Sequence, residues 1–121
     1  RLGLQPDVFH MNIAEASIPD ALRAAGNRIK HIHVNETNHY PVGSGHADHR
    51  SIIRTLKEIE FDGFLSVYMP YTTQDVFHLA RTSNGDSAPR PDVRSVMAEQ
   101  LQFLKQIEST VDAEGEINRE Q

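Results

Sequence analysis

The stretch Ile29-Lys30-His31-Ile32-His33-Val34 decides the fold of this chain. Its apolar and polar side chains alternate with a period of two residues, which predicts a β-strand. Ile32 and Val34 are then on one face of the strand, and Ile29 shares the other face with the two histidines. The histidine-bearing face is the one suited to chemistry.

Helical patterns flank this strand on both sides. Ser17 is expected to cap a helix that ends at Gly26, since glycine commonly terminates helices. Asp48 is expected to cap a second helix, whose apolar side chains follow a period of 3.6 residues. A third and longest helix is predicted over residues 92–109.

Two further strands complete the pattern. Residues 2–8 are expected to form a first strand, interrupted by Pro6, and residues 64–68 to form a third. Residues 72–91 are predicted to be mostly loop, and residues 110–121 a polar, acidic and frayed tail. Strands separated by helices pair in parallel through right-handed crossovers, which predicts an α/β fold of three parallel βα units.

Three βα units make an incomplete sheet. It has two open edges and a half-built interior, lined here by Ile29, His31, Phe64 and Ser66. Burial of an exposed apolar side chain is worth on the order of 1.5–3 kcal/mol, which favours association. We therefore expect a homo-oligomer, or association with the remaining segments of a larger α/β assembly.

The composition limits the possible functions. The chain has 121 residues, the length of one domain, and 38% of them are apolar. It has no cysteine, which excludes disulfides, thiolate metal sites and cysteine nucleophiles. The net charge of −5 argues against nucleic acid as a partner, and no apolar run approaches the roughly 20 residues of a membrane helix. We expect a soluble, cytoplasmic protein that binds neither nucleic acid nor membrane.

Candidate ligands gather where the expected strands end. They are Asp7 and His10 after the first strand, His31 and His33 in the second, and Tyr68 at the end of the third. Parallel α/β folds bind ligands at the carboxyl ends of their strands. Carboxylate oxygen and imidazole nitrogen suit Mn²⁺, Co²⁺ or Zn²⁺. The alternative is that the aspartate is an ordinary turn residue and that the histidines only pack or bond to neighbours.

The loop after the second strand is open to two interpretations. Its segment Gly43-Ser44-Gly45-His46 is similar to a phosphate-binding loop but lacks the lysine that usually follows. His46 and His49 flank Asp48 at a helix start, so helix capping and solvent exposure are the expected roles there. His78, later in the chain, is expected at the surface.

The segments at the strand ends resemble a known family. Residues 7–13 (Asp-Val-Phe-His-Met-Asn-Ile) and 31–38 (His-Ile-His-Val-Asn-Glu-Thr-Asn) are similar to motifs of the xylose-isomerase-like TIM barrels, specifically the ketose 3-epimerases. Two further segments, 43–48 and 61–67, are similar as well. The resemblance covers residues 1–109 and implies the last three βα units of a (β/α)8 barrel.

The resemblance implies metal-assisted proton transfer next to the carbonyl of a ketose. Asp7 and His33 correspond to ligands of one divalent metal, Mn²⁺ first, or Co²⁺, Mg²⁺ or Zn²⁺, and are expected within about 5 Å of each other. His10 matches a histidine that binds substrate oxygens, and His39 stands where the family has a substrate-binding arginine. Glu36 falls within the motif after the histidine ligand and has no assigned role.

The catalytic glutamates of the family have no counterpart in this sequence. Tyr68 stands where the family has the glutamate that ends the last strand. Tyrosine is a poor ligand and, with an ordinary pKa of about 10, a poor base. The second glutamate ends an earlier strand, before the part of the barrel that is matched. No catalytic residue is therefore assigned, and metal binding is expected to be weak or absent.

Three hypotheses on function follow. The first is a sugar isomerase or epimerase whose chain is inactive alone. The second is a non-catalytic descendant of such an enzyme, acting as an oligomeric structural or binding module. The third is a DNA-repair endonuclease of the same superfamily with several zinc ions, which the acidic charge disfavours.

Overall fold

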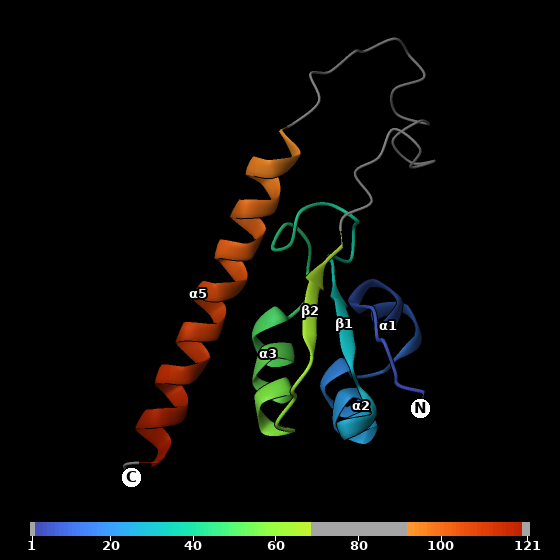
Figure 1. The fold of residues 1–121 in the computed structure, drawn as a ribbon, viewed down its shortest axis with the longest axis vertical. Coiled ribbons are helices and arrows are strands. Elements are labelled where there is room, and N and C mark those ends of the chain that lie inside the picture. Colours follow the sequence, from blue (N-terminus) through green and yellow to red (C-terminus); the bar gives the residue numbers. More distant parts are fainter. Residues whose placement is uncertain (1, 69–91, 120–121) are drawn as a thin grey trace.

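In the part of the chain that the structure describes, two parallel strands form a sheet (Figure 1). The computed structural model describes residues 2–68 and 92–119. Strand β1 comprises His31–Val34 and strand β2 comprises Phe64–Val67, and they pair in parallel along their whole length. The parallel pairing predicted for these two strands is confirmed. The expected loop over residues 72–91 lies outside the described residues.

The expected first strand is not a continuous strand. It runs parallel to its neighbour through two isolated bridges, one joining Leu4 to Ile29 and one joining Asp7 to His33. Pro6, between them, has no N–H to donate to a ladder, although its carbonyl accepts the His33 N–H at 2.9 Å. The prediction of a regular strand here is wrong, whereas its predicted direction is confirmed.

A short helix begins where the sequence pattern placed the end of that strand. Helix α1 comprises Val8–Ala14, and Asp7 is its N-cap. The Asp7 Oδ1 atom accepts the His10 N–H at 3.1 Å. An aspartate cap satisfies an N–H at the start of a helix, so the helical conformation prevails over extension of the strand.

The other helices begin close to the predicted positions. Helix α2 comprises Ile18–Ala25, the 3₁₀ helix η1 Gly26–Arg28, helix α3 His49–Glu58 and helix α5 Val93–Arg119. Ser17 and Asp48 cap α2 and α3 as predicted, each accepting a backbone N–H, at 3.3 Å and 3.0 Å. Gly26 ends α2 with a φ of 54°, a conformation that favours glycine.

The core lies on the helix-facing side of the sheet, where α5 packs along α3 (Figure 1). Ile32 and Val34 are buried there, as the alternation predicts. Ile29 is also buried, with 2% of its surface exposed, because the chain before α1 pairs beside it. The prediction that Ile29 lines an open interior is therefore wrong.

Helix α5 continues through the segment that was expected to be a frayed tail. Val111 is buried in the core, and Glu114 forms ion pairs with Arg50 and Arg54 of α3. These contacts hold the last turns of α5 against α3. The expectation of fraying is therefore wrong for residues 110–119, which are helical.

The sheet is open on the face away from the helices. Phe64 is 78% exposed and Tyr68 is 47% exposed. His31 Nε2 lies 2.7 Å from Ser66 Oγ, so these residues share a face, as predicted. Among the described residues, no helix is long and apolar enough to cross a membrane.

Candidate functional site

Asp7 and His33 meet at the carboxyl end of β1. The parallel bridge between these two residues sets their backbones side by side. The Asp7 Oδ2 atom lies 3.5 Å from His33 Nδ1. The expected approach of the two side chains is therefore confirmed, and it results from the pairing of two segments 26 positions apart in the sequence.

Asn35 connects this pair to α1. Its side-chain Nδ2 donates to both carboxylate oxygens of Asp7, at 3.0 Å and 2.9 Å. Its Oδ1 accepts the Phe9 N–H at 2.7 Å. Asn35 is only 2% exposed, so water has little access to these bonds. Both polar ends of one buried amide are thus used to hold Asp7 and the first turn of α1.

Aromatic rings surround His33. The Tyr68 ring stacks on it with centroids 5.3 Å apart and 16° between the planes, and the His31 ring meets it edge-on at 5.2 Å. Gln5 Nε2 lies 2.6 Å from His33 Nε2, so the imidazole is held through its second nitrogen as well. Tyr68 therefore stands directly at the pair, and its backbone N–H donates to the Val34 carbonyl at 2.9 Å.

His10 and His39 both lie against the Phe9 ring. The ring centroids of Phe9 and His10 are 5.4 Å apart, and those of Phe9 and His39 are 3.7 Å apart. His39 adopts a φ of 60°, an uncommon conformation for a residue other than glycine. The structure thus brings the two expected sugar-binding histidines together around one aromatic ring, next to the Asp7 cap.

The donor types of the Asp7–His33 pair fit a divalent metal ion. Two ligand atoms that are each about 2.1 Å from one ion lie roughly 3–3.5 Å apart, which agrees with the observed separation. The number of ligands is small, since no group of three or more His, Cys, Asp or Glu residues suited to a metal occurs within residues 2–68 and 92–119. The pair could supply half of a four-ligand site.

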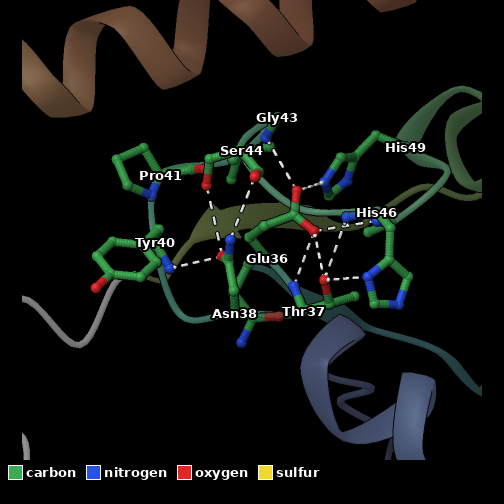
Figure 2. Close-up of polar contacts among 12 residues, drawn as sticks. Glu36, Thr37, Asn38, Tyr40, Pro41, Gly43, Ser44, His46 and His49 are labelled. Atoms are coloured by element: carbon green, nitrogen blue, oxygen red, sulfur yellow. Dashed lines mark hydrogen bonds and ion pairs between the residues drawn. The ribbon is translucent and has the colours of Figure 1, made fainter. Parts of the chain in front are cut away.

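Glu36 is the centre of a hydrogen-bond network in the loop that follows β1 (Figure 2). We call residues 36–47 the β1–α3 loop. The Glu36 side chain is fully buried, with 0% exposed. Its Oε1 accepts the Thr37 N–H and hydroxyl and the Ala47 N–H, and its Oε2 accepts the Gly43 N–H and the His49 imidazole, all at 2.8–3.1 Å.

These donors keep the Glu36 carboxylate ionised. Burial by itself raises the pKa of Glu36, because it disfavours the charged form. The hydrogen bonds outweigh burial and lower the pKa of Glu36 to about 2. The donors that lower it are Thr37, Ala47, His49 and Gly43. Glu36 is thus a fixed negative charge within the fold.

His49 is buried rather than exposed, so the expectation of solvent exposure at this position is wrong. Only 3% of it is accessible, and its Nε2 lies 3.0 Å from Glu36 Oε2. Its Nδ1 is buried and has no hydrogen-bond partner among the described residues. A proton on Nδ1 would be an unpaired buried donor, so the neutral ring with its proton on Nε2 suits this environment. The Phe103 ring of α5 meets His49 edge-on at 6.4 Å.

The loop that resembles a phosphate cradle does hold an anion, but the anion is the Glu36 carboxylate. The Gly43 N–H donates to it at 3.0 Å. Gly43 has a φ of 92°, and a Cβ there would meet the Phe103 ring. A Cβ on Gly45 would overlap the Glu36 carboxylate itself. The lack of a side chain at the two glycines thus allows the loop to close on Glu36. The Gly43 N–H is used in the hydrogen bond to the Glu36 carboxylate.

Two residues of this region were not identified from the sequence. Asn35 and Glu36 follow β1 directly, and both are buried. One signal was available for Glu36, namely the glycine-rich segment a few residues later, since such loops offer N–H groups to an anion. No signal in the sequence distinguishes Asn35 from an ordinary loop asparagine.

The comparisons with known proteins agree with this arrangement. Residues 1–107 match the family described as xylose isomerase-like TIM barrel. A D-psicose 3-epimerase of Enterocloster bolteae is 38% identical over 68 residues, which are 56% of this chain and 22% of that protein. An L-ribulose 3-epimerase of a Methylomonas species is 35% identical over 60 residues, 50% of this chain and 21% of that protein.

Solved structures give the same result. A structure of L-ribulose 3-epimerase superposes with a TM-score of 0.77 and 25% identity, covering 95% of this chain and 39% of that one. A D-psicose 3-epimerase structure determined in the presence of D-fructose superposes with a TM-score of 0.69 and 26% identity. The match covers 88% of this chain and 38% of that one. The chain spans about a fifth of the length of the curated relatives it matches. With its parallel βα units, this chain belongs to the xylose isomerase-like TIM barrel family.

Proposed function

We propose that this chain contributes the Asp7–His33 half of the metal site of a ketose 3-epimerase. The observation that carries the proposal is the 3.5 Å approach of a carboxylate and an imidazole at the carboxyl end of β1. This is the end of the strands where enzymes with this fold carry their active sites. The epimerases of psicose and ribulose among the relatives support a ketose as the substrate class.

The surrounding side chains have distinct proposed roles. Asp7 and His33 would hold one divalent ion, with Mn²⁺ as the first candidate. When bound, such an ion stabilises negative charge on oxygen as a Lewis acid. His10 and His39 would donate hydrogen bonds to sugar hydroxyls. The Phe9 ring, which both histidines contact, would offer an apolar surface to the C–H groups of a sugar.

The proton transfer itself requires groups other than these. Glu36 is excluded as the acid or base, because it is fully buried and both its oxygens already accept hydrogen bonds. Tyr68 is a poor base at neutral pH. We therefore propose that the 121-residue chain alone does not epimerise ketoses and that the carboxylates come from outside it.

The open face of the sheet is the proposed surface for association. The exposed Phe64 and Tyr68 face where further barrel strands would lie, which favours association with such segments or with a second copy. We propose that residues 1–109 form one part of the barrel. We also propose that the protein is located in the cytoplasm.

We expect the chain to bind Mn²⁺ with a dissociation constant in the micromolar range or weaker, because two protein ligands make a weak site. Calorimetry on the 121-residue chain measures this directly. Asp7→Asn is expected to weaken binding by more than about 10-fold, because it removes the charge of one of the two protein ligands. D-Fructose is expected to tighten Mn²⁺ binding, whereas D-glucose is not, since the proposed site takes a ketose.

Asp62→Asn is the matched control for that substitution. Asp62 is exposed in the turn before β2, at the amino end of the strand and away from the pair. The Asp62→Asn substitution should leave the affinity for Mn²⁺ unchanged. Submicromolar binding by the unaltered chain, or equal binding by the Asp7→Asn chain, would contradict the proposed site.

Tyr68→Glu is expected to tighten Mn²⁺ binding by about 10-fold. The Tyr68 ring already stacks on His33, so a glutamate there can supply a third ligand of the type that Mn²⁺ prefers. A tenfold gain corresponds to about 1.4 kcal/mol. Tyr68→Gln removes the ring in the same way without adding charge, and it should give no comparable gain. Equal affinities for the Glu and Gln variants would place residue 68 away from the metal.

A further inference from the structure

We propose that Asn35 is a positioning residue, which holds the Asp7 carboxylate in the orientation that faces His33. The inference rests on the proposed function, because it assigns a metal-binding role to Asp7. It concerns a residue that does not touch the ion or the sugar and that acts only through its hydrogen bonds.

The first argument is the geometry of the contact. Asn35 Nδ2 lies 3.0 Å from Asp7 Oδ1 and 2.9 Å from Asp7 Oδ2, so one amide group reaches both oxygens. A carboxylate has about four lone-pair positions, two on each oxygen. The two bonds to Asn35 do not use all of these positions, and Asp7 Oδ2 lies 3.5 Å from His33 Nδ1.

The second argument is the anchoring of the other end of the amide. Asn35 Oδ1 accepts the Phe9 N–H at 2.7 Å, one of the N–H groups that a helix start leaves without a partner. The side chain is 98% buried, so rotation of the amide would break bonds that water cannot replace. Asn35 therefore links the end of β1, which carries His33, to the start of α1, which carries Asp7.

The third argument is the chemistry of the residue type. A side-chain amide offers a donor to a carboxylate and an acceptor to an N–H from the same planar group, without a change of charge. An aspartate of the same shape would set two carboxylates against each other, and leucine would leave both partners unsatisfied. Partners that orient metal ligands in this way commonly change metal affinity by about 10-fold to 100-fold when removed.

The test is a titration of the ¹⁵N-labelled 121-residue chain with Zn²⁺, a diamagnetic ion, followed by NMR. The side-chain NH₂ signals of Asn35 are expected to shift together with the ring signals of His33. Asn38 is the internal control, because it lies three positions after Asn35 and its side chain bonds to Ser44 and Tyr40 instead. Its NH₂ signals should stay in place.

The corresponding variants are Asn35→Ala and Asn38→Ala. Asn35→Ala is expected to weaken Zn²⁺ binding about 10-fold while far-UV circular dichroism stays unchanged, and Asn38→Ala should not weaken it. Shifts at Asp7 and His33 without shifts at Asn35, or full affinity in a folded Asn35→Ala chain, overturn the inference alone. Absence of any shift at Asp7 and His33 overturns the proposed metal site together with it. The titration uses the unaltered chain, so it decides the question even where a variant does not fold.

Discussion

Glu36→Gln is expected to lower the free energy of unfolding by about 3–5 kcal/mol. The substitution removes the buried charge that five hydrogen bonds satisfy, and it sets an amide NH₂ group against N–H donors. A hydrogen bond to a charged group contributes about 1.5–3 kcal/mol, and a buried donor left without a partner costs about 1–3 kcal/mol. Small domains are stable by only about 5–15 kcal/mol, so the variant should be close to unfolding at room temperature.

Urea denaturation followed by circular dichroism measures this effect. Glu58→Gln is the matched control, since Glu58 is 44% exposed and pairs with Arg23 at 2.8 Å on the surface. Exposed pairs of this kind contribute about 0–1 kcal/mol. Similar losses for the two variants would mean that the Glu36 network does not stabilise the fold.

Acidification is the second perturbation with a large expected effect. The pKa of Glu36 is about 2 in the folded chain and 4.5 in its ordinary state. Because the folded value is the lower one, the unfolded chain binds the proton more tightly. The stabilisation is therefore fully present above pH 4.5 and is lost as the pH falls toward 2. A difference of about 2.5 units corresponds to roughly 3 kcal/mol.

The difference in unfolding free energy between the original chain and Glu36→Gln isolates this contribution from other titrating groups. We expect the difference to be largest at pH 5 and above, and to shrink by roughly 3 kcal/mol by pH 2. Urea midpoints at several pH values between these limits give the curve. A difference that stays constant over this range would show that Glu36 is not ionised below its ordinary pKa.

Local patterns predicted much of the fold. The alternation over residues 29–34 gave the correct faces of β1 for Ile32 and Val34, and the caps Ser17 and Asp48 lie where the sequence places them. These features depend on neighbours only a few positions away. The first strand could not be predicted in the same way, because the choice between strand and helix near Asp7 depends on Asn35, which is distant in sequence.

The candidate site was predictable to a similar extent. The resemblance to the motifs of the ketose 3-epimerases predicted correctly that Asp7 and His33 lie close together. The roles of Glu36 and His49 could not be inferred, because a buried ionisable residue looks the same in sequence as an exposed one. Their burial depends on the path of the β1–α3 loop and on the Phe103 ring of α5. Phe103 is more than fifty positions from His49 in the sequence, so local patterns do not reveal this contact.

The closure of the β1–α3 loop on Glu36 also determines how this region responds to its medium. A dissolved anion occupies a binding loop only in proportion to its concentration, whereas a tethered carboxylate is present at an effective concentration in the millimolar range or higher. The loop that carries His39 therefore keeps its shape without phosphate or any other solute. Other anions do not bind in the β1–α3 loop, because the Glu36 carboxylate already accepts its N–H groups. The position of His39 in the proposed sugar site is therefore independent of the anion concentration.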